Sequence, residues 1–388
     1  MQDFEKKRRT KLRTPCRDFR NLSRSRADDT ADDTTERHVT ASSCISPPHD
    51  YTAWFHPPNH PIEEVRGLLQ QLYGMDPDLI PISGERDQNF IVVQDGEQQA
   101  ILKISNPDET EAYTAFQVAL LEHLQESALG LPVPQVIKTR DGAPYTVWTF
   151  QNGQVSAVRL VSYLHGSPAH GTVAAWARKT GEIQGRLCRA LADFDHPGAA
   201  EAMPWNASAA PLFEDSFLSG LGPELTRLLS PHLERLKNAS LPRLLTLRRQ
   251  VIHNDMHPGN ILLGSAGEIS GIIDFGDAIK APLIQDLAVS ATSLVEAAPH
   301  AAADQLQDLI DGFSSKCPLT AEDLGLLHDA MIMRSILSVM LGRVKDQTVQ
   351  PKDRPRAATA ASETGLRAIL ALRLPAPQSG HSGCCANE

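Results

Sequence analysis

The chain has 388 residues, of which 41% are hydrophobic and 22% charged, and this length and composition suit a globular protein with more than one core. Its formal net charge of -10 argues against binding along a phosphate backbone, so we expect no nucleic-acid partner. Six irregularly spaced cysteines argue against a zinc site and a disulfide framework. We expect no apolar run long enough to span a membrane and therefore no membrane partner.

Both ends of the chain are predicted to be flexible. Residues 1–50 are expected to form a disordered tail, because basic residues and then Asp and Thr repeats leave few apolar groups to offset the entropy of ordering. An arginine-rich start is typical of mitochondrial transit peptides, but Asp3, Glu5 and Asp18 depart from their acid-poor pattern. We therefore expect a cytoplasmic protein, with mitochondrial targeting as the alternative. Residues 375–388 are expected to form a second flexible tail.

Residues 51–165 are predicted to form a small β-rich lobe that binds a nucleotide. The expected elements are, in chain order, a helix from Pro61 to Gly74, strands over 89–93 and 100–104 joined by a turn at Asp95–Gly96, a helix over 109–125, and strands over 136–138, 145–150 and 155–163. Together these elements predict a small sheet that carries helices.

Residues 166–374 are predicted to form a larger α-helical lobe that holds the catalytic and substrate-binding groups. The expected helices cover 176–194, 221–236, 284–295, 302–313, 321–341 and 363–372, and short strands fall at 251–252, 261–263 and 271–273. Because a β-rich half precedes an α-rich half, the sequence predicts an α+β protein with a bilobal fold.

The segment from Val251 to Asp277 has the clearest chemical pattern. His253, Asp255 and Asn260 form the spacing H-x-D-x-x-x-x-N, and Asp274 follows fourteen residues past Asn260 at the head of a D-F-G sequence. Short apolar runs flank this polar loop. The joint pattern of spacing, order and flanking strands predicts a catalytic centre.

This set of side chains fits phosphoryl transfer, in which the protein mostly positions the reactants and stabilises charge. Asp255 is predicted to act as the catalytic base that orients the acceptor hydroxyl and accepts its proton. Asn260 and Asp274 are predicted to hold Mg²⁺, which takes oxygen ligands. His253 is interpreted as a histidine that braces the loop.

A kinase also needs a cation at the phosphates of the nucleotide. Lys103 lies in an apolar strand, where an ammonium group needs a partner or must emerge into a cleft, so it is predicted to contact phosphate. Glu111 and Glu122 lie three helical turns apart and share a face of the following helix. Either of them is a candidate partner of Lys103, and exposed charges are the alternative interpretation of both.

The loop expected to cover the phosphates is poor in glycine. Ser83, Gln88 and Asn89 are therefore predicted to donate side-chain hydrogen bonds to the nucleotide. The base is expected against the linker from Val161 to Tyr163, whose backbone has both donors and acceptors. The sequence leaves the choice between guanine and adenine open.

These residues carry a resemblance to a known family. The loop H-N-D-M-H-P-G-N, with the later I-D-F-G-D and D-L-A, resembles the aminoglycoside phosphotransferase/choline kinase family, and further segments resemble its hydroxylysine kinases and their bacterial relatives. The further matching stretches are Asp87–Phe90, Leu102–Asn106, Val158–Gly166, Phe194–Pro197, Pro204–Asn206 and Gly271–Asp277.

The resemblance implies a protein-kinase-like fold, Mg²⁺, and GTP or ATP as the phosphoryl donor, with GTP as the donor of the hydroxylysine kinases. It implies the same roles for Asp255, Asn260, Asp274 and Lys103. In relatives, an acidic residue often precedes the Phe-Gln pair of the first helix. Ala115 stands at that position here, which leaves the partner of Lys103 open.

The first functional hypothesis is a kinase of a hydroxylated amine or amino acid, with 5-hydroxy-L-lysine as the first choice. Asp277 and Asp286 are the candidates for binding a substrate ammonium, together with Glu182, and Arg159 or Arg186 for binding its carboxylate. Arg159 paired locally within its strand, and Asp286 as a helix or loop brace, are the alternatives. Other acceptors are an aminoglycoside, choline or homoserine. A nucleotide-binding scaffold without turnover is the third hypothesis, and the complete catalytic set argues against it.

Overall fold

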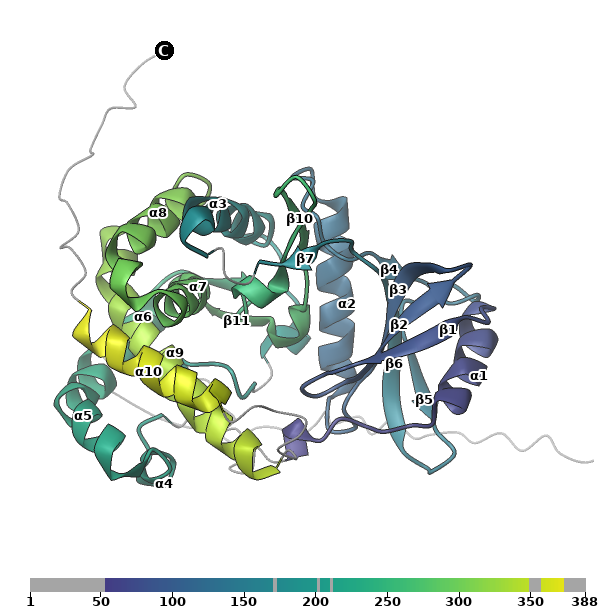
Figure 1. Cartoon of the computed structure of the whole chain (residues 1–388), viewed down its shortest axis with the longest axis horizontal. Helices are drawn as coiled ribbons and strands as arrows, with labels where there is room; N and C mark the ends of the chain where they lie inside the picture. The colour runs from purple at the N-terminus through teal and green to yellow at the C-terminus, as the bar shows by residue number, and fades with distance from the viewer. Residues whose placement is uncertain (1–52, 170–172, 201–202, 210–211, 349–356, 373–388) are drawn as a thin grey trace, which may run out of the picture. The chain divides into compact units, whose positions relative to one another are not determined.

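The computed structural model describes residues 53–169, 173–200, 203–209, 212–348 and 357–372. The tails that we expect at 1–50 and 375–388 lie outside these residues. The described part is a mixed α+β protein, with an antiparallel sheet in its first half and mostly helices in its second half (Figure 1).

A six-stranded antiparallel sheet forms the first lobe. Its strands are β1 (Asp78–Ile82), β2 (Gln88–Gln94), β3 (Glu97–Ile104), β4 (Val136–Ile137), β5 (Thr146–Thr149) and β6 (Val155–Ser162). The order is β1-β2-β3-β6-β4, and β5 also pairs with β6. The sheet stands between α1 (Ile62–Tyr73) and α2 (Glu111–Glu126) (Figure 1). Alternate residues of its strands pack on α1 and form a separate apolar core.

The predicted hairpin of the first lobe is confirmed. The strands β2 and β3 pair in antiparallel register around Asp95 and Gly96, whose φ angles are 55° and 82°. Two consecutive residues with positive φ give the turn the twist that a tight hairpin requires, and Asp-Gly is a preferred sequence for it. The hairpin therefore fixes the register that places Lys103 opposite Asn89.

Helices form most of the second lobe, with short strands next to the catalytic segment. The helices are α3 (Val173–Ala190), α4 (Asp215–Ser219), α5 (Gly222–Arg235), α6 (Leu241–Thr246), α7 (Leu283–Ala297), α8 (Ala302–Ser314), α9 (Ala321–Thr348) and α10 (Ala357–Ala371). The strands are β7 (Ser167–Pro168), β9 (Ile261–Leu263) and β10 (Ile269–Ile272) in one sheet, and β8 (Arg249–Ile252) and β11 (Ile279–Pro282) in another.

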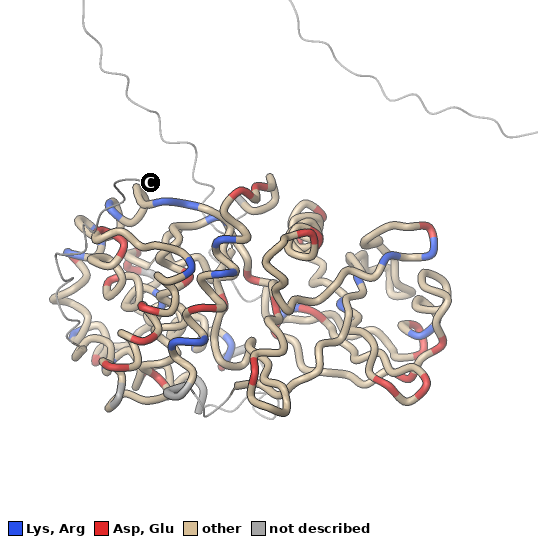
Figure 2. The backbone as a smooth tube through the Cα atoms, turned by 90° about the horizontal axis from the view of Figure 1, so that it is seen from above, with Lys and Arg blue, Asp and Glu red and all other residues tan. Residues whose placement is uncertain are grey.

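Close helix packing holds the second lobe together. The helix α3 lies against α8, and α7 lies against α9 and α10. Gly312 of α8 allows the first approach, since a Cβ atom there would lie 2.1 Å from the carbonyl oxygen of Arg178 on α3. Charged residues of both signs are interspersed along the described backbone of both lobes (Figure 2).

One segment, Ala321–Asp346 of α9, is long and apolar enough to cross a membrane by length and composition, with a mean hydropathy of 1.5. Our expectation that no apolar run reaches this length is therefore wrong. Of its most apolar window, 78% is buried inside the protein, and Met331, Ile336 and Leu337 expose no surface. The apolar residues of α9 belong to the core.

Candidate active site

The catalytic loop leaves β8 at His253 and is held by side chains beneath it. His253 is fully buried, its Nδ1 accepts from the backbone N–H of Asp255 (3.3 Å), and its Nε2 lies 3.0 Å from the carbonyl oxygen of Ile273. An accepting Nδ1 leaves the proton on Nε2, which donates to that carbonyl. His253 thus connects the loop to the strand before Asp274, in the bracing position that we predicted.

Asp286 also braces this loop, which corrects our expectation that it faces the substrate. Its carboxylate is buried with 0% exposure and accepts from the backbone N–H of Asn254 (2.7 Å) and from Nε2 of Gln184 (3.0 Å). Asp286 lies in the first turn of α7, so its side chain points back under the loop rather than into the cavity beside Asp255. The bracing alternative therefore describes Asp286.

Asp255 lies among cationic and polar partners. Its Oδ1 is 3.2 Å from Nη2 of Arg334, its Oδ2 accepts from Nδ2 of Asn260 at 2.8 Å, and Nε2 of His257 lies 3.5 Å from Oδ2. Burial alone would raise the pKa of Asp255, but His257 and Arg334 hold this pKa below its usual value. The carboxylate stays ionised at neutral pH, and 18% of it remains exposed to meet a substrate.

A backbone hydrogen bond connects Asn260 to the residue before Asp274. The N–H of Ile273, the residue before Asp274, donates to the carbonyl oxygen of Asn260 at 3.0 Å. Nδ2 of Asn260 donates to Asp255, so Oδ1 of Asn260 remains available as a ligand atom. The Asp274 carboxylate is 54% exposed, and nearby Lys103 lowers its pKa to about 2. An amide oxygen and a carboxylate that is ionised at neutral pH are oxygen ligands of the kind that Mg²⁺ takes, so these residues fit the predicted metal site.

Lys103 points from β3 toward the same site, and its partners correct our expectation. Its Nζ lies 3.5 Å from Oδ1 of Asp274 and 3.7 Å from Oδ2 of Asp87. Neither helix glutamate reaches it: Glu111 accepts from the hydroxyl of Tyr145, and Glu122 pairs with Lys138.

Asp87 takes the place of the helix glutamate by joining two cations. Its Oδ2 also lies 3.3 Å from Nη2 of Arg159, which is buried with a side-chain exposure of 3% and pairs with Glu109 at 3.7 Å. Arg159 therefore pairs locally, as our alternative stated, and is not free for a substrate carboxylate. Arg186 donates to the carbonyl oxygen of Leu129 and does not line the cavity of Asp255 either.

Cross-strand pairing orders the face of the sheet that looks onto the site. Ile80, Ile91, Ile101 and Val161 lie opposite one another on neighbouring strands and form an apolar row. A second row lies two positions away on each strand and consists of Ile82, Asn89, Lys103 and Arg159. Residues two apart share a face, so an apolar platform and a polar one lie side by side. This arrangement suits a base on the first row and phosphates on the second.

Two of the three side chains predicted to bind the nucleotide, Ser83 of the β1–β2 loop and Asn89 at the start of β2, lie at this space. Ser83 and Asn89 line a cavity of about 120 Å³ together with Lys103, Asp255 and Asp274. Gln88 was predicted to bind the nucleotide as well, but its Oε1 accepts from the N–H of His60 and its Nε2 donates to the carbonyl of the same residue. The amide group of Gln88 thus fixes the segment before α1.

The end of β6 and Tyr163 correct the prediction that backbone donors and acceptors of Val161 to Tyr163 bind the base. The N–H of Ser162 donates to the carbonyl of Gln135 (2.8 Å), and the N–H of Tyr163 donates to that of Gln99 (2.9 Å). Both N–H groups already donate to backbone carbonyl oxygens, so the N–H of Tyr163 is not available to a base. Val161 contributes its side chain to the apolar row instead.

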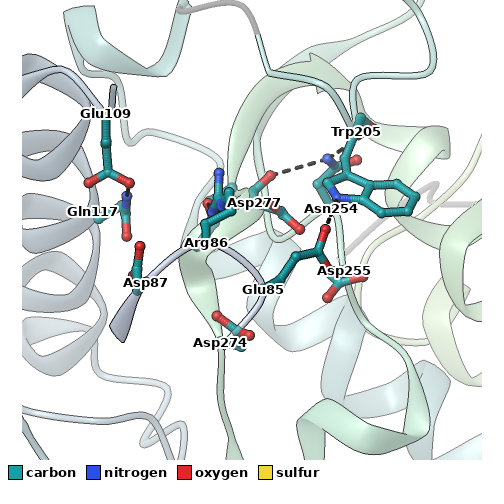
Figure 3. A network of polar contacts seen from close by, with 12 residues as sticks. Glu85, Arg86, Asp87, Glu109, Gln117, Trp205, Asn254, Asp255, Asp274 and Asp277 are labelled. Carbon is teal, nitrogen blue, oxygen red and sulfur yellow. Dashed lines mark hydrogen bonds and ion pairs between the residues drawn. The ribbon is translucent and has the colours of Figure 1, made fainter. Parts of the chain in front are cut away.

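Asp277 lies at the site, behind an arginine. Arg86 of the β1–β2 loop donates to the carbonyl oxygen of Gly276, and its Nη2 lies 3.2 Å from Oδ1 of Asp277. Figure 3 shows Asp255, Asp274 and Asp277 around the turn that carries Glu85 and Arg86. Burial raises the pKa of Asp277 to about 7 despite the opposing effect of Arg86.

A cavity of about 500 Å³ opens beside Asp255 on the side of the second lobe. The charged side chains that line it are Glu85, Asp255, His257, Asp277, Glu296, Arg334 and Lys345. Glu182 is not among its lining residues. Sequence reasoning missed Arg334, Glu296 and Asp87. A lone arginine inside the apolar part of the helix over 321–341 is the one signal that pointed to Arg334.

Several known proteins are similar to this chain. The profile described as the phosphotransferase enzyme family (APH) matches residues 78–315. A hydroxylysine kinase of Danio rerio is 24% identical over 331 residues, which cover 81% of this chain and 92% of that protein. A homoserine kinase of Rhodopseudomonas palustris is 28% identical over 253 residues, covering 61% and 72% respectively. The solved structure of the amicoumacin kinase hAmiN has a TM-score of 0.62 at 15% identity and covers 80% of this chain and 94% of its own. The protein-kinase-like fold is confirmed.

Proposed function

We propose that this chain, which belongs to the phosphotransferase enzyme family, phosphorylates the side-chain hydroxyl of 5-hydroxy-L-lysine with GTP as donor. Phosphoryl transfer to a small-molecule hydroxyl follows from the family and from relatives named hydroxylysine kinase and homoserine kinase. The hydroxylysine kinases among these relatives support the acceptor. The resemblance to that branch supports GTP, with ATP as the alternative donor.

One observation carries the proposal: Asp255 lies between Asn260 and Asp274, the pair predicted to hold metal, and a cavity with charges of both signs. Asn260, which bonds to Asp255, is tied through the Ile273 backbone to Asp274. On its other side Asp255 opens into the cavity that Glu296 and Lys345 also line. An amino acid with two amines and one carboxylate needs both acidic and basic walls.

In this proposal, the base of the nucleotide lies on the apolar row of the sheet and its phosphates lie beside Lys103. Asn260 and Asp274 would hold Mg²⁺, which would supply positive charge to the phosphate oxygens. Asp255 accepts the hydroxyl proton while the substrate oxygen bonds to the γ-phosphorus and the bond to the β-phosphate oxygen breaks. The nucleoside diphosphate leaves, and Lys103 stays close to its phosphates.

A second candidate acceptor is homoserine, which the homoserine kinase relative favours. Homoserine has one amine and is shorter than hydroxylysine. A site that pairs both amines of hydroxylysine would lose interactions with it. A scaffold without turnover is a third possibility, and it predicts nucleotide binding without any phosphorylated product.

Steady-state kinetics distinguishes these candidates. We expect kcat/KM for 5-hydroxy-L-lysine to exceed that for homoserine, choline and kanamycin, and GTP to be preferred over ATP. L-Lysine should give no product, because it has no acceptor oxygen. If any competitor exceeds hydroxylysine tenfold or more, the proposed substrate is wrong and the kinase chemistry stands. If none of these compounds is phosphorylated, the hypothesis of a nucleotide-binding scaffold without turnover remains.

A further inference from the structure

Two helix faces form the walls of the cavity beside Asp255. On α7, Val289, Thr292, Ser293, Glu296 and Ala297 line it, and on α9, Arg334, Ser338, Gly342 and Lys345 do so. These positions repeat at the three- and four-residue spacing of one helical face. The cavity is therefore a slot between α7 and α9, with the catalytic loop at one end.

Carboxylates outnumber cations in this slot. Four acidic side chains line it, against two side chains that are always cationic and His257. The guanidinium of Arg334 forms an ion pair with Asp255 and donates to the carbonyl oxygens of Asn254 and Trp205. Lys345 pairs with Glu85 and lies over the rings of Phe55 and Trp205. Both cations of the slot thus have carboxylate partners.

Two acidic residues of the slot, Asp277 and Glu296, each have a buried oxygen without a hydrogen-bond partner among the residues that the structure describes. Oδ1 of Asp277 lies 3.2 Å from Nη2 of Arg86, whereas Glu296 has no ion-pair partner among the described residues. Its side chain is pressed against α10, where a Cβ atom on Gly365 would lie 2.2 Å from Cγ of Glu296. The residue is half-buried, and a carboxylate that is partly removed from water is stabilised when a cation pairs with it. Burial raises the pKa of Glu296 to about 7, in line with this missing partner.

We propose that Glu296 binds an ammonium group of the substrate that lies away from the reacting hydroxyl, and that it determines selectivity for acceptors with a second amine. This inference rests on the proposed kinase function. In 5-hydroxy-L-lysine the ε-ammonium adjoins the hydroxyl and lies near Asp255, so the α-ammonium is the group for Glu296. A charge-assisted hydrogen bond to the ammonium gives the carboxylate a cationic partner in the slot.

The test compares ligands that differ only in the α-ammonium. Calorimetry measures Kd for L-lysine and Nα-acetyl-L-lysine, and for 5-hydroxy-L-lysine and its Nα-acetyl derivative, in the full-length protein with Mg²⁺ and GDP. Wild type should bind each free amine about 10-fold or more tightly than its acetylated partner, the range for a charged hydrogen bond. In Glu296→Gln the preference should fall below about threefold, and Glu296→Asp should restore part of it.

Glu322→Gln is the matched control, because Glu322 lies at the exposed start of α9 and pairs with Arg243 outside the slot. It should keep the full preference. A preference unchanged in Glu296→Gln, or absent from wild type, overturns the inference. Turnover assays on the same samples test the proposed function separately. If hydroxylysine is phosphorylated but the protein does not prefer the free amines, only the role of Glu296 is wrong. If the protein prefers the free amines but does not phosphorylate hydroxylysine, only the proposed acceptor is wrong.

Discussion

Asn254 and Asp274 hold left-handed backbone at the site although neither is glycine, with φ angles of 65° and 62°. Such a conformation costs an L-residue roughly 1–2 kcal/mol. Asn254 is kept there from several sides: its N–H donates to Asp286, its Nδ2 donates to the carbonyl of Asp277, and its Oδ1 accepts from Gln285. The surrounding side chains thus fix the direction of the next residue, Asp255.

At the scale of a residue, Asp274→Ala should remove metal-dependent nucleotide binding. Asn260 alone is a neutral ligand, so we expect Kd for MgGTP to rise about 100-fold or more, which corresponds to about 3 kcal/mol. Calorimetry with and without EDTA measures this. Asp308→Ala on the exposed face of α8 is the control and should bind like wild type. Affinity for MgGTP that stays within threefold of wild type would remove Asp274 from the metal site.

At the scale of elements, the second lobe depends on how closely α3 approaches α8. Gly312 meets the backbone of α3, with Arg178 O at 2.1 Å and Glu182 N at 3.1 Å from an added Cβ atom. Gly181 of α3 meets the backbone of α8 in the same way, with Leu309 O at 2.1 Å. Backbone atoms cannot move aside as a flexible side chain does, so both positions require glycine.

Gly312→Ala should therefore lower the free energy of unfolding by roughly 1–3 kcal/mol, the cost of overpacking a close contact. Gly325→Ala is the matched control, because Gly325 is exposed on α9 and an added Cβ atom has nothing within 4 Å. That change should raise stability by roughly 0.5–1 kcal/mol through helix propensity. Urea unfolding measures both variants. Equal effects of the two substitutions would contradict this packing.

For the whole molecule, the sequence predicted the features that neighbouring residues determine. It did not predict the contacts that form when distant elements pack together. The turn at Asp95–Gly96 follows from φ angles that these residues favour, and the spacing from Asp255 to Asn260 lies within one loop. Arg334 meets Asp255 from 79 positions away, through the packing of α9. Local spacing holds no information about such contacts.

The same reason explains the errors at the site. Asp286 and Gln88 are polar residues near the catalytic and phosphate segments, and proximity in sequence made them candidates. The structure uses both to hold backbone, through Asn254 N–H for Asp286 and through His60 for Gln88. The roles of Asp286 and Gln88 depend on where their side chains point, and their positions in the sequence do not show this.

The identity of the product tests the proposed reaction as a whole. Purified protein with Mg²⁺, GTP and 5-hydroxy-L-lysine should give a phosphate ester on the side-chain oxygen, visible by ³¹P NMR coupled to the carbon-bound proton, with one ester formed per GDP. Asp255→Asn should bind GTP normally and lower the rate by ~10²–10⁴-fold, the usual contribution of a general base. GDP formed without any ester, or an Asp255→Asn variant that keeps more than about half of the wild-type kcat, would contradict the reaction proposed for this site.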